Sequence, residues 1–185
     1  MQKWVALNGT GGGIAILNDS KYSYSAEDNT LYLTVLRSPI YNDQGRRRTD
    51  PDAEISDQGL QEFCYSVMSY CGSHDEINRC ALALNKGLTN VIENNHNGIL
   101  PECDSAISVS NDNVIVTALK RAEDNGGLVI RLTETVGRDT AVTVRGKAIA
   151  VPLDITLTKW STDTYILRDS ETDWKKVLLT EFDIG

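Results

Sequence analysis

The fold class of this chain follows from one stretch, Val114-Ile115-Val116-Thr117-Ala118-Leu119-Lys120-Arg121-Ala122-Glu123-Asp124-Asn125-Gly126-Gly127-Leu128-Val129-Ile130-Arg131-Leu132. Two runs of apolar and β-branched residues flank a loop centred on Asp124–Gly127. Such runs favour extended backbone, and glycine supplies the positive φ angles that tight turns require. The stretch therefore predicts an antiparallel hairpin.

Short runs of the same kind recur along the rest of the chain. Leu31, Leu33 and Val35 would share one face of a strand, because apolar residues at every second position mark a half-buried strand. The runs predict about ten short strands, each closed by a turn residue, which is typical of an antiparallel sandwich or barrel. We therefore expect an all-β fold. The further runs are Phe63–Val67, Ala141–Val144, Ile155–Leu157, Tyr165–Leu167 and Val177–Phe182.

One segment departs from this period and predicts a single short helix over residues 74–86. Ser73 and Glu76 have the spacing of a capping box, in which each side chain bonds a free backbone N–H. Ile77 and Ala81 then follow at helical spacing, and Gly87 stands where helices commonly end. The polar stretches Tyr41–Ser56 and Asn90–Asp104 are expected to be irregular.

Length, composition and charge exclude several classes of protein. The chain has 185 residues, of which 41% are hydrophobic and 24% charged, as in a folded globular protein. The net charge of −8 argues against nucleic-acid binding, which needs a basic surface. No apolar run approaches the roughly 20 residues that span a bilayer, so no membrane interaction is expected. The abrupt start in a strand-like sequence is expected of a fragment.

The four cysteines predict neither a disulfide framework nor a structural zinc site. Cys64, Cys71, Cys80 and Cys103 are irregularly spaced, and none forms a Cys-x-x-Cys pair. We expect free, mostly buried thiols in a reducing cytoplasm.

No catalytic centre emerges from the residue pattern. His74 and His96 lack partners at metal-ligand spacing, and no phosphate-binding loop or nucleophile elbow occurs. Glu134 continues the apolar face of its strand, so it needs a cation or a backbone partner, and a structural ion pair is the default expectation. The run Arg46–Arg48 is expected to be a solvated loop. The three tryptophans could stack on sugars but are expected in the core: Trp4, Trp160 and Trp174.

Five ordered segments resemble motifs of the α-mannosidases of glycoside hydrolase family 38. Gly13–Tyr24 is similar to the family's Leu-Asn-Asp-x-Lys-Tyr stretch, and Asn29–Pro39 to its Leu-Leu-Arg-Ser-Pro strand. Asp57–Tyr65 follows the family's Asp-x-Gly-x-His-x-Phe-x-Tyr pattern, with Gln61 in place of its histidine. Ala118–Asp124 and Arg131–Gly137 resemble two later motifs. The resemblance implies a C-terminal all-β region, with residues 1–104 as part of a mutarotase-like supersandwich and 105–185 as a smaller antiparallel sandwich.

The resemblance also implies a function. Family members are retaining enzymes that hydrolyse terminal α-mannosides with an aspartate nucleophile and zinc or another divalent metal in an N-terminal catalytic domain. No catalytic residue and no metal ligand is therefore expected in this chain, which would support and complete the pocket of that domain. Arg37 is the expected substrate-binding residue, with the loop Tyr41–Asp57 beside it. The other role for Arg37 is an ion pair at a strand end.

Expected partners are the catalytic domain of the same protein, mannose-containing glycans and, through the parent enzyme, further copies. The expected location is the cytoplasm, as for a bacterial-type enzyme. Two other functions stay open, namely a stand-alone carbohydrate-binding module and an oligomerisation domain. A carbohydrate-binding module would bind sugar directly. An oligomerisation domain would show a concentration-dependent mass and no sugar affinity.

Overall fold

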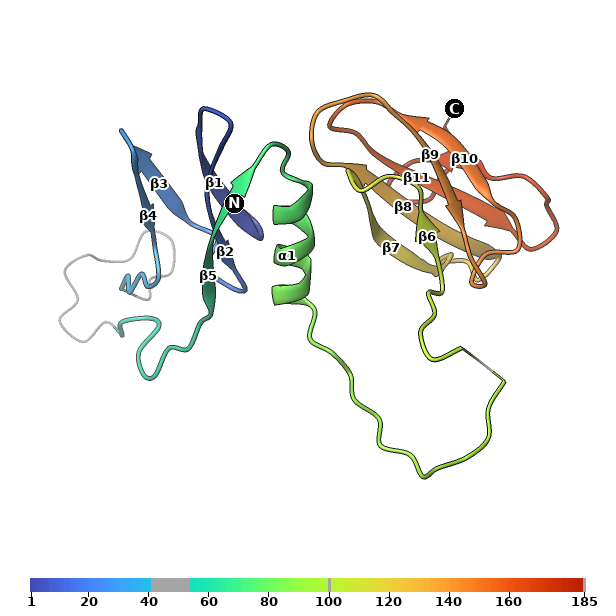
Figure 1. Ribbon diagram of the computed structural model, residues 1–185, viewed down its shortest axis with the longest axis horizontal. Helices are drawn as coiled ribbons and strands as arrows, with labels where there is room; N and C mark the ends of the chain where they lie inside the picture. Colours follow the sequence, from blue (N-terminus) through green and yellow to red (C-terminus); the bar gives the residue numbers. More distant parts are fainter. Residues whose placement is uncertain (41–53, 100, 185) are drawn as a thin grey trace. The chain divides into compact units, whose positions relative to one another are not determined.

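The computed structural model describes residues 1–40, 54–99 and 101–184, and the chain divides into two compact units, Met1–Thr89 and Asn90–Gly185. Strands dominate both units and one helix is present among the described residues (Figure 1). The placement of a domain boundary at residue 104 stays a prediction.

The first unit holds a three-stranded antiparallel sheet in the order β1-β2-β5. A tight turn at Thr10 and Gly11 joins β1 to β2, and Gly11 has a φ of 85°. A separate hairpin is formed by β3 and β4. The strands are β1 (Trp4–Gly9), β2 (Gly12–Asn18), β3 (Tyr24–Glu27), β4 (Thr30–Leu33) and β5 (Tyr65–Cys71).

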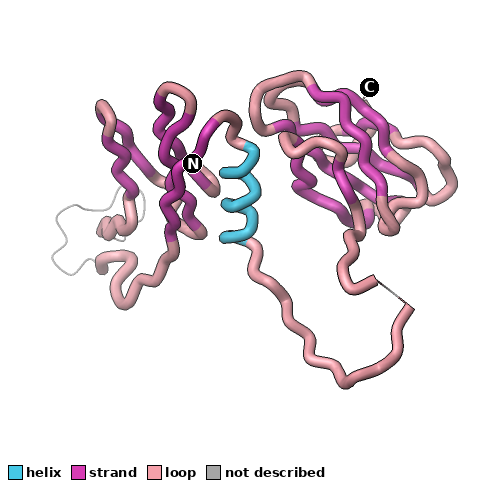
Figure 2. The backbone as a smooth tube through the Cα atoms, in the orientation of Figure 1, coloured by secondary structure: helices cyan, strands magenta, loops and turns pink. Residues whose placement is uncertain are grey.

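Helix α1 (Asp75–Asn85) covers one face of the β1-β2-β5 sheet (Figure 2). The helical spacing brings Ile77 and Ala81 onto one side, where both are fully buried. They pack against Ala15, Leu17 and Tyr70 of the sheet. The predicted helix is thus confirmed.

The predicted capping box at the start of α1 is wrong. The N-cap is His74, and no side chain bonds a free N–H there. The Ser73 hydroxyl instead donates to the Asp75 carboxylate at 2.7 Å. The helix begins one residue too late for Ser73 to reach the backbone N–H that a box requires.

The second unit is an antiparallel β-sandwich of two sheets, with strand orders β12-β11-β8-β7 and β10-β9-β6. Every pairing within the two sheets is antiparallel. The strands are β6 (Ser108–Val109), β7 (Val114–Arg121), β8 (Gly127–Glu134), β9 (Thr140–Arg145), β10 (Leu153–Leu157), β11 (Thr162–Arg168) and β12 (Lys175–Val177).

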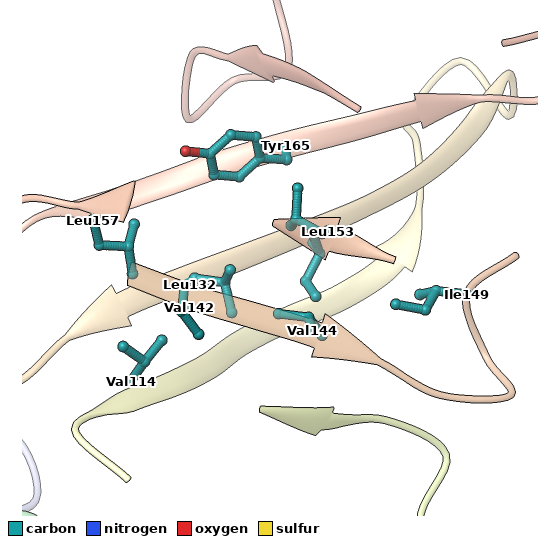
Figure 3. Packing of buried hydrophobic residues seen from close by; sticks show 9 residues of the cluster. Val114, Leu132, Val142, Val144, Ile149, Leu153, Leu157 and Tyr165 are labelled. Carbon is teal, nitrogen blue, oxygen red and sulfur yellow. The ribbon is translucent and has the colours of Figure 1, made fainter. Parts of the chain in front are cut away.

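Alternate residues of both sheets point into a common core, as Figure 3 shows. Leu132 on β8, Val144 on β9 and Leu157 on β10 are fully buried. Burying one such side chain stabilises the fold by about 1.5–3 kcal/mol relative to leaving it in water. The all-β antiparallel sandwich with one short helix is therefore confirmed.

The hairpin predicted from the opening stretch is formed by β7 and β8. Asn125 takes a φ of 57° at the turn, and the Gly126 N–H donates to the Asp124 carboxylate at 2.9 Å. The Ala122 N–H bonds the Gly127 carbonyl at 2.9 Å and closes the loop. Polar turn residues thus hold the loop, as the composition of the segment indicated.

Two other predictions need correction. The predicted strand Val177–Phe182 ends at Val177, because Glu181 adopts a φ of 70° and the Leu178 N–H bonds the Phe182 carbonyl. The cysteines are free, but all four are exposed rather than buried. No helix in the described part of the chain is long and apolar enough to cross a membrane.

Candidate functional site

Three segments that lie far apart in the sequence meet at one open depression of about 230 Å³ in the first unit. They come from the Leu-Asn-Asp-x-Lys-Tyr stretch, the Leu-Arg-Ser-Pro stretch and the Asp-x-Gly-x-Gln segment. The lining residues are Ser20–Ser23, Thr34–Arg37, Asp57 and Gln61. The fold thus gathers three of the five motifs that carry the family resemblance.

The β3–β4 hairpin brings the first two of these segments together. Its ladder continues beyond β4, because the Thr34 N–H donates to the Ser23 carbonyl at 3.0 Å. Residues 34–37 therefore run beside residues 20–23, and both segments are open to solvent.

Asp19 of the first motif anchors the third motif through Cys64. Its Oδ1 accepts a hydrogen bond from the Cys64 N–H at 3.1 Å and another from the Ser20 hydroxyl at 2.8 Å. The Asp19 N–H in turn bonds the Cys64 carbonyl at 3.3 Å. The hydrogen bonds from Ser20 and Cys64 lower the pKa of Asp19, because they favour the charged carboxylate.

Aromatic contacts add to this anchor. The Lys21 ammonium lies 5.5 Å from the centre of the Phe63 ring, within the range of a cation–π interaction. Phe63 stacks on Tyr65 with ring centres 6.2 Å apart. The segment before β5 is thus held against the residues that line the depression.

Arg37, the residue predicted to contact substrate, lies exposed on the wall of this depression. No ion pair joins Arg37 to another residue in the part of the chain that the structure describes. The backbone just after it is fixed, since the Ser56 N–H bonds the Pro39 carbonyl at 2.9 Å and Ile40 pairs with Ile55. Most of the predicted loop Tyr41–Asp57, including Arg46–Arg48, lies outside the described residues.

The depression offers hydrogen-bond donors and acceptors on an open surface. Arg37 and Lys21 supply donors, Asp57 supplies an acceptor, and the Gln61 amide supplies both. Such a set suits a hydroxyl-rich ligand. In the sequence alone, Gln61 is only a departure from the family pattern, and no local pattern distinguishes Lys21 or Asp57. Their positions within the motifs Gly13–Tyr24 and Asp57–Tyr65 are the one signal that points to them.

The histidines do not share a site. His74 packs between Trp4 and Tyr70, with ring centres 5.3 Å from each. His96 bonds Glu93 at 2.8 Å, and this carboxylate raises the pKa of His96. Within residues 1–40, 54–99 and 101–184, no group of three or more His, Cys, Asp or Glu side chains is placed to hold a metal ion.

In the second unit, Glu134 is a buried carboxylate with only 1% of its surface exposed. Its Oε2 accepts from the backbone N–H groups of Gly137 at 2.8 Å and Trp160 at 2.9 Å. Its Oε1 accepts from the Val136 N–H and the Asn113 amide, both at 2.9 Å. The backbone alternative is therefore confirmed for Glu134, and the default expectation of an ion pair is wrong.

The electrostatics of Glu134 follow from these contacts. Burial alone would raise its pKa, but the hydrogen bonds from Trp160, Asn113, Val136 and Gly137 outweigh burial and lower the pKa to about 2. The carboxylate is therefore ionised at neutral pH without a cationic partner among the described residues, and it holds two turns of the sandwich together.

The three tryptophans differ in their surroundings. Trp4 and Trp174 are partly buried, and their indole N–H groups bond Asn78 at 2.8 Å and the Val151 carbonyl at 2.9 Å. Trp160 is 65% exposed, so its predicted place in the core is wrong. Its backbone N–H bonds the Glu134 carboxylate at 2.9 Å in a turn, and its side chain lies over Gly137 at the surface.

Comparisons with known proteins bear on both units. Residues 1–52 match the family described as the glycosyl hydrolases family 38 C-terminal domain. Residues 113–162 match the glycosyl hydrolases family 38 C-terminal beta sandwich domain. The two matched ranges fall in different units of the structure.

Several relatives carry the name α-mannosidase. The chain is 28% identical to alpha-mannosidase G of Dictyostelium discoideum over 81% of its own length and 13% of the relative's. It is 33% identical to alpha-mannosidase 2C1 of Mus musculus and of Homo sapiens, over 73% of its length and 12% of theirs. The chain thus spans about an eighth of the length of these relatives. With both domain matches in the order that the motifs require, the chain belongs to the C-terminal region of the glycoside hydrolase family 38 α-mannosidases.

Proposed function

We propose that this chain is the non-catalytic C-terminal β region of a retaining, metal-dependent α-mannosidase that hydrolyses terminal α-mannosides. It packs on an N-terminal catalytic domain that holds zinc or another divalent cation, and Arg37 reaches the substrate pocket of that domain. The observation that carries this proposal is the convergence of three family motifs on the depression beside Arg37.

The chemistry of the depression suits this role. A guanidinium group donates hydrogen bonds in a fixed fork, so it can bind two neighbouring hydroxyls of a sugar. The Ser56 contact to Pro39 fixes the backbone that follows Arg37, and the exposed guanidinium extends from this fixed backbone into the depression.

A surface of the first unit suits the packing. The sheet face away from α1 carries apolar side chains that the described residues leave in solvent, such as Ile14 at 54% and Val67 at 60% exposure. Tyr65 lies on the same face. An apolar patch of this kind marks a surface that meets another protein or domain. In the proposal, the catalytic domain covers this face.

Arg37→Ala in the longer enzyme tests the proposal. Loss of a hydrogen bond to a charged group costs about 1.5–3 kcal/mol, so kcat/KM for 4-nitrophenyl α-mannoside should fall about 10- to 150-fold. The matched control is Arg145→Ala, which removes an exposed arginine from the second unit and should leave kcat/KM unchanged. The isolated chain should not hydrolyse this substrate with or without added zinc. Turnover by the isolated chain would contradict the proposal. So would an Arg37→Ala variant whose kcat/KM is unchanged or falls no further than that of Arg145→Ala.

A further inference from the structure

We propose that Trp160 is a saccharide-binding platform, with one pyranose ring stacked on its exposed indole. The site lies in the second unit and is separate from the depression beside Arg37 in the first. The site is argued from its geometry alone. Only the choice of mannose as the probe sugar rests on the family of the chain and on the proposed function. Four features of Trp160 carry the inference: its exposure, its backbone conformation, its clamp and its neighbours.

The backbone of Trp160 is held in an unfavourable conformation. Its φ is 59°, in the left-handed region that bulky residues rarely adopt. Asparagine or glycine would occupy this position with less strain. Strained residues concentrate at binding sites, where the surrounding structure fixes them. A tryptophan that is both strained and 65% exposed contributes little to the free energy of unfolding. Ligand binding is therefore a better explanation for a tryptophan at this position than stability.

A clamp on the Glu134 carboxylate fixes the backbone of Trp160. The backbone N–H of Trp160 donates to Glu134 Oε2 at 2.9 Å, and the same oxygen accepts from the Gly137 backbone N–H at 2.8 Å. The ring lies against Gly137, where an added Cβ would fall 2.6 Å from indole carbon atoms. The indole therefore lies over Gly137, while 65% of the Trp160 surface stays open to a ligand. A ring fixed in advance loses little entropy on binding.

The neighbours of Trp160 favour a saccharide over a protein surface. Thr158, Lys159, Arg138 and Asp139 on the two clamped turns are all polar and exposed. The Lys159 N–H bonds the Asp139 carboxylate at 2.9 Å, which ties these two turns together. A protein-binding hot spot lies within an apolar patch that excludes water, and these turns supply none. A single flat aromatic ring among hydrogen-bonding groups instead matches a sugar, which has an apolar C–H face and a rim of hydroxyls.

Titration of the full 185-residue chain with methyl α-mannoside and mannobiose tests the proposal. The readout is the indole N–H resonance of Trp160 in nitrogen-15 spectra, with Trp4 and Trp174 as internal references. We expect saturable shifts at Trp160 with a Kd of about 1–10 mM, typical of a single stacked ring. Trp160→Gly should weaken binding at least tenfold, as measured by calorimetry and ligand-observed NMR.

Two further variants separate the loss of a site from the loss of the fold. Glycine adopts a φ of 59° readily, so Trp160→Gly should unfold at the same urea concentration as wild type or a higher one. Phe182→Ala, at a position 72% exposed on the same unit, should bind sugar like wild type.

Undiminished sugar binding by Trp160→Gly, or no saturable shift at about 100 mM sugar, would overturn the proposal. A concentration-dependent mass that Trp160→Gly abolishes, without sugar affinity in wild type, would show a protein interface and would also overturn it. Neither outcome affects the Arg37 proposal, because that test measures turnover in the longer enzyme. Sugar affinity at Trp160 is compatible both with a β region of that enzyme and with a stand-alone carbohydrate-binding module, and the Arg37 test distinguishes these two.

Discussion

Glu134→Gln is expected to destabilise the second unit by about 3 kcal/mol at pH 7. Glutamine keeps the shape of glutamate but replaces one carboxylate oxygen by an NH2 group. In place of Oε2, the NH2 group faces the Gly137 and Trp160 N–H groups, and in place of Oε1 it faces the Val136 N–H and the Asn113 amide. An unbonded buried donor costs about 1–3 kcal/mol, and the backbone donors here are part-buried, so two of them cost about 3 kcal/mol together.

The pKa of Glu134, which the same hydrogen bonds lower, corresponds to a similar magnitude. A carboxyl with an ordinary pKa of 4.5 that titrates at about 2 in the folded protein stabilises that fold by about 3 kcal/mol when ionised. Because the folded-state pKa is the lower one, this contribution is complete above about pH 5. It is lost as the pH falls toward 2. The acid side of the stability curve should therefore depend strongly on this single side chain.

Urea unfolding between pH 2 and pH 7 measures this effect, with the indole resonances of Trp160 and Trp174 as the readout for the second unit. With a slope of about 1–3 kcal/mol per molar urea, the midpoint of Glu134→Gln should drop by about 1–3 M at pH 7. Its stability should also vary less with pH below 5 than that of wild type. The matched control is Glu123→Gln, at an exposed surface pair with Lys120, which should change stability by less than about 1 kcal/mol. A Glu134→Gln midpoint equal to wild type at pH 7, or an unchanged acid slope, would refute the reasoning.

Two further predictions concern the clamp and the depression. Gly137→Ala should destabilise the second unit by at least about 1 kcal/mol, because φ is 85° there and the new Cβ would meet the Trp160 indole; thermal melts and Trp160 fluorescence measure this. Asp19→Ala should speed hydrogen exchange at the Cys64 amide by releasing its bond, while the Ala122 amide in the other unit keeps its wild-type rate; unchanged exchange at Cys64 would contradict the assigned anchor.

Local patterns predicted the elements that depend on neighbouring residues. The β7–β8 hairpin follows from two β-branched runs around Asp124–Gly127, and these turn residues bond within their own loop. Helix α1 follows from the spacing of Ile77 and Ala81. In both cases the physical cause lies within a few residues of the pattern, so a single sequence carries it.

Features that depend on distant residues were beyond a local pattern. Glu134, at the end of β8, accepts a hydrogen bond from the backbone N–H of Trp160, in the turn before β11. No spacing rule predicts a contact between residues that are so far apart in the sequence. Trp160 lies in the turn that this bond holds, and its side chain is exposed there against the expectation from its apolar character. The depression beside Arg37 likewise needs Asp19 to bond Cys64, and only the folded first unit brings these together. The order of the motifs in the sequence indicated the family. Only the tertiary fold shows that three of these motifs line one depression.

The β1-β2-β5 sheet has a consequence for handling the protein. Among the described strands, β1 and β5 each pair on one side only, so both expose a row of backbone donors and acceptors. Beside an apolar face, such edges recruit strands from other molecules. The isolated chain should therefore form soluble oligomers or aggregates as its concentration rises. The substitution Val67→Lys, on the outer face of β5, should keep the isolated chain monomeric for the measurements above, because it places a charge on the apolar face.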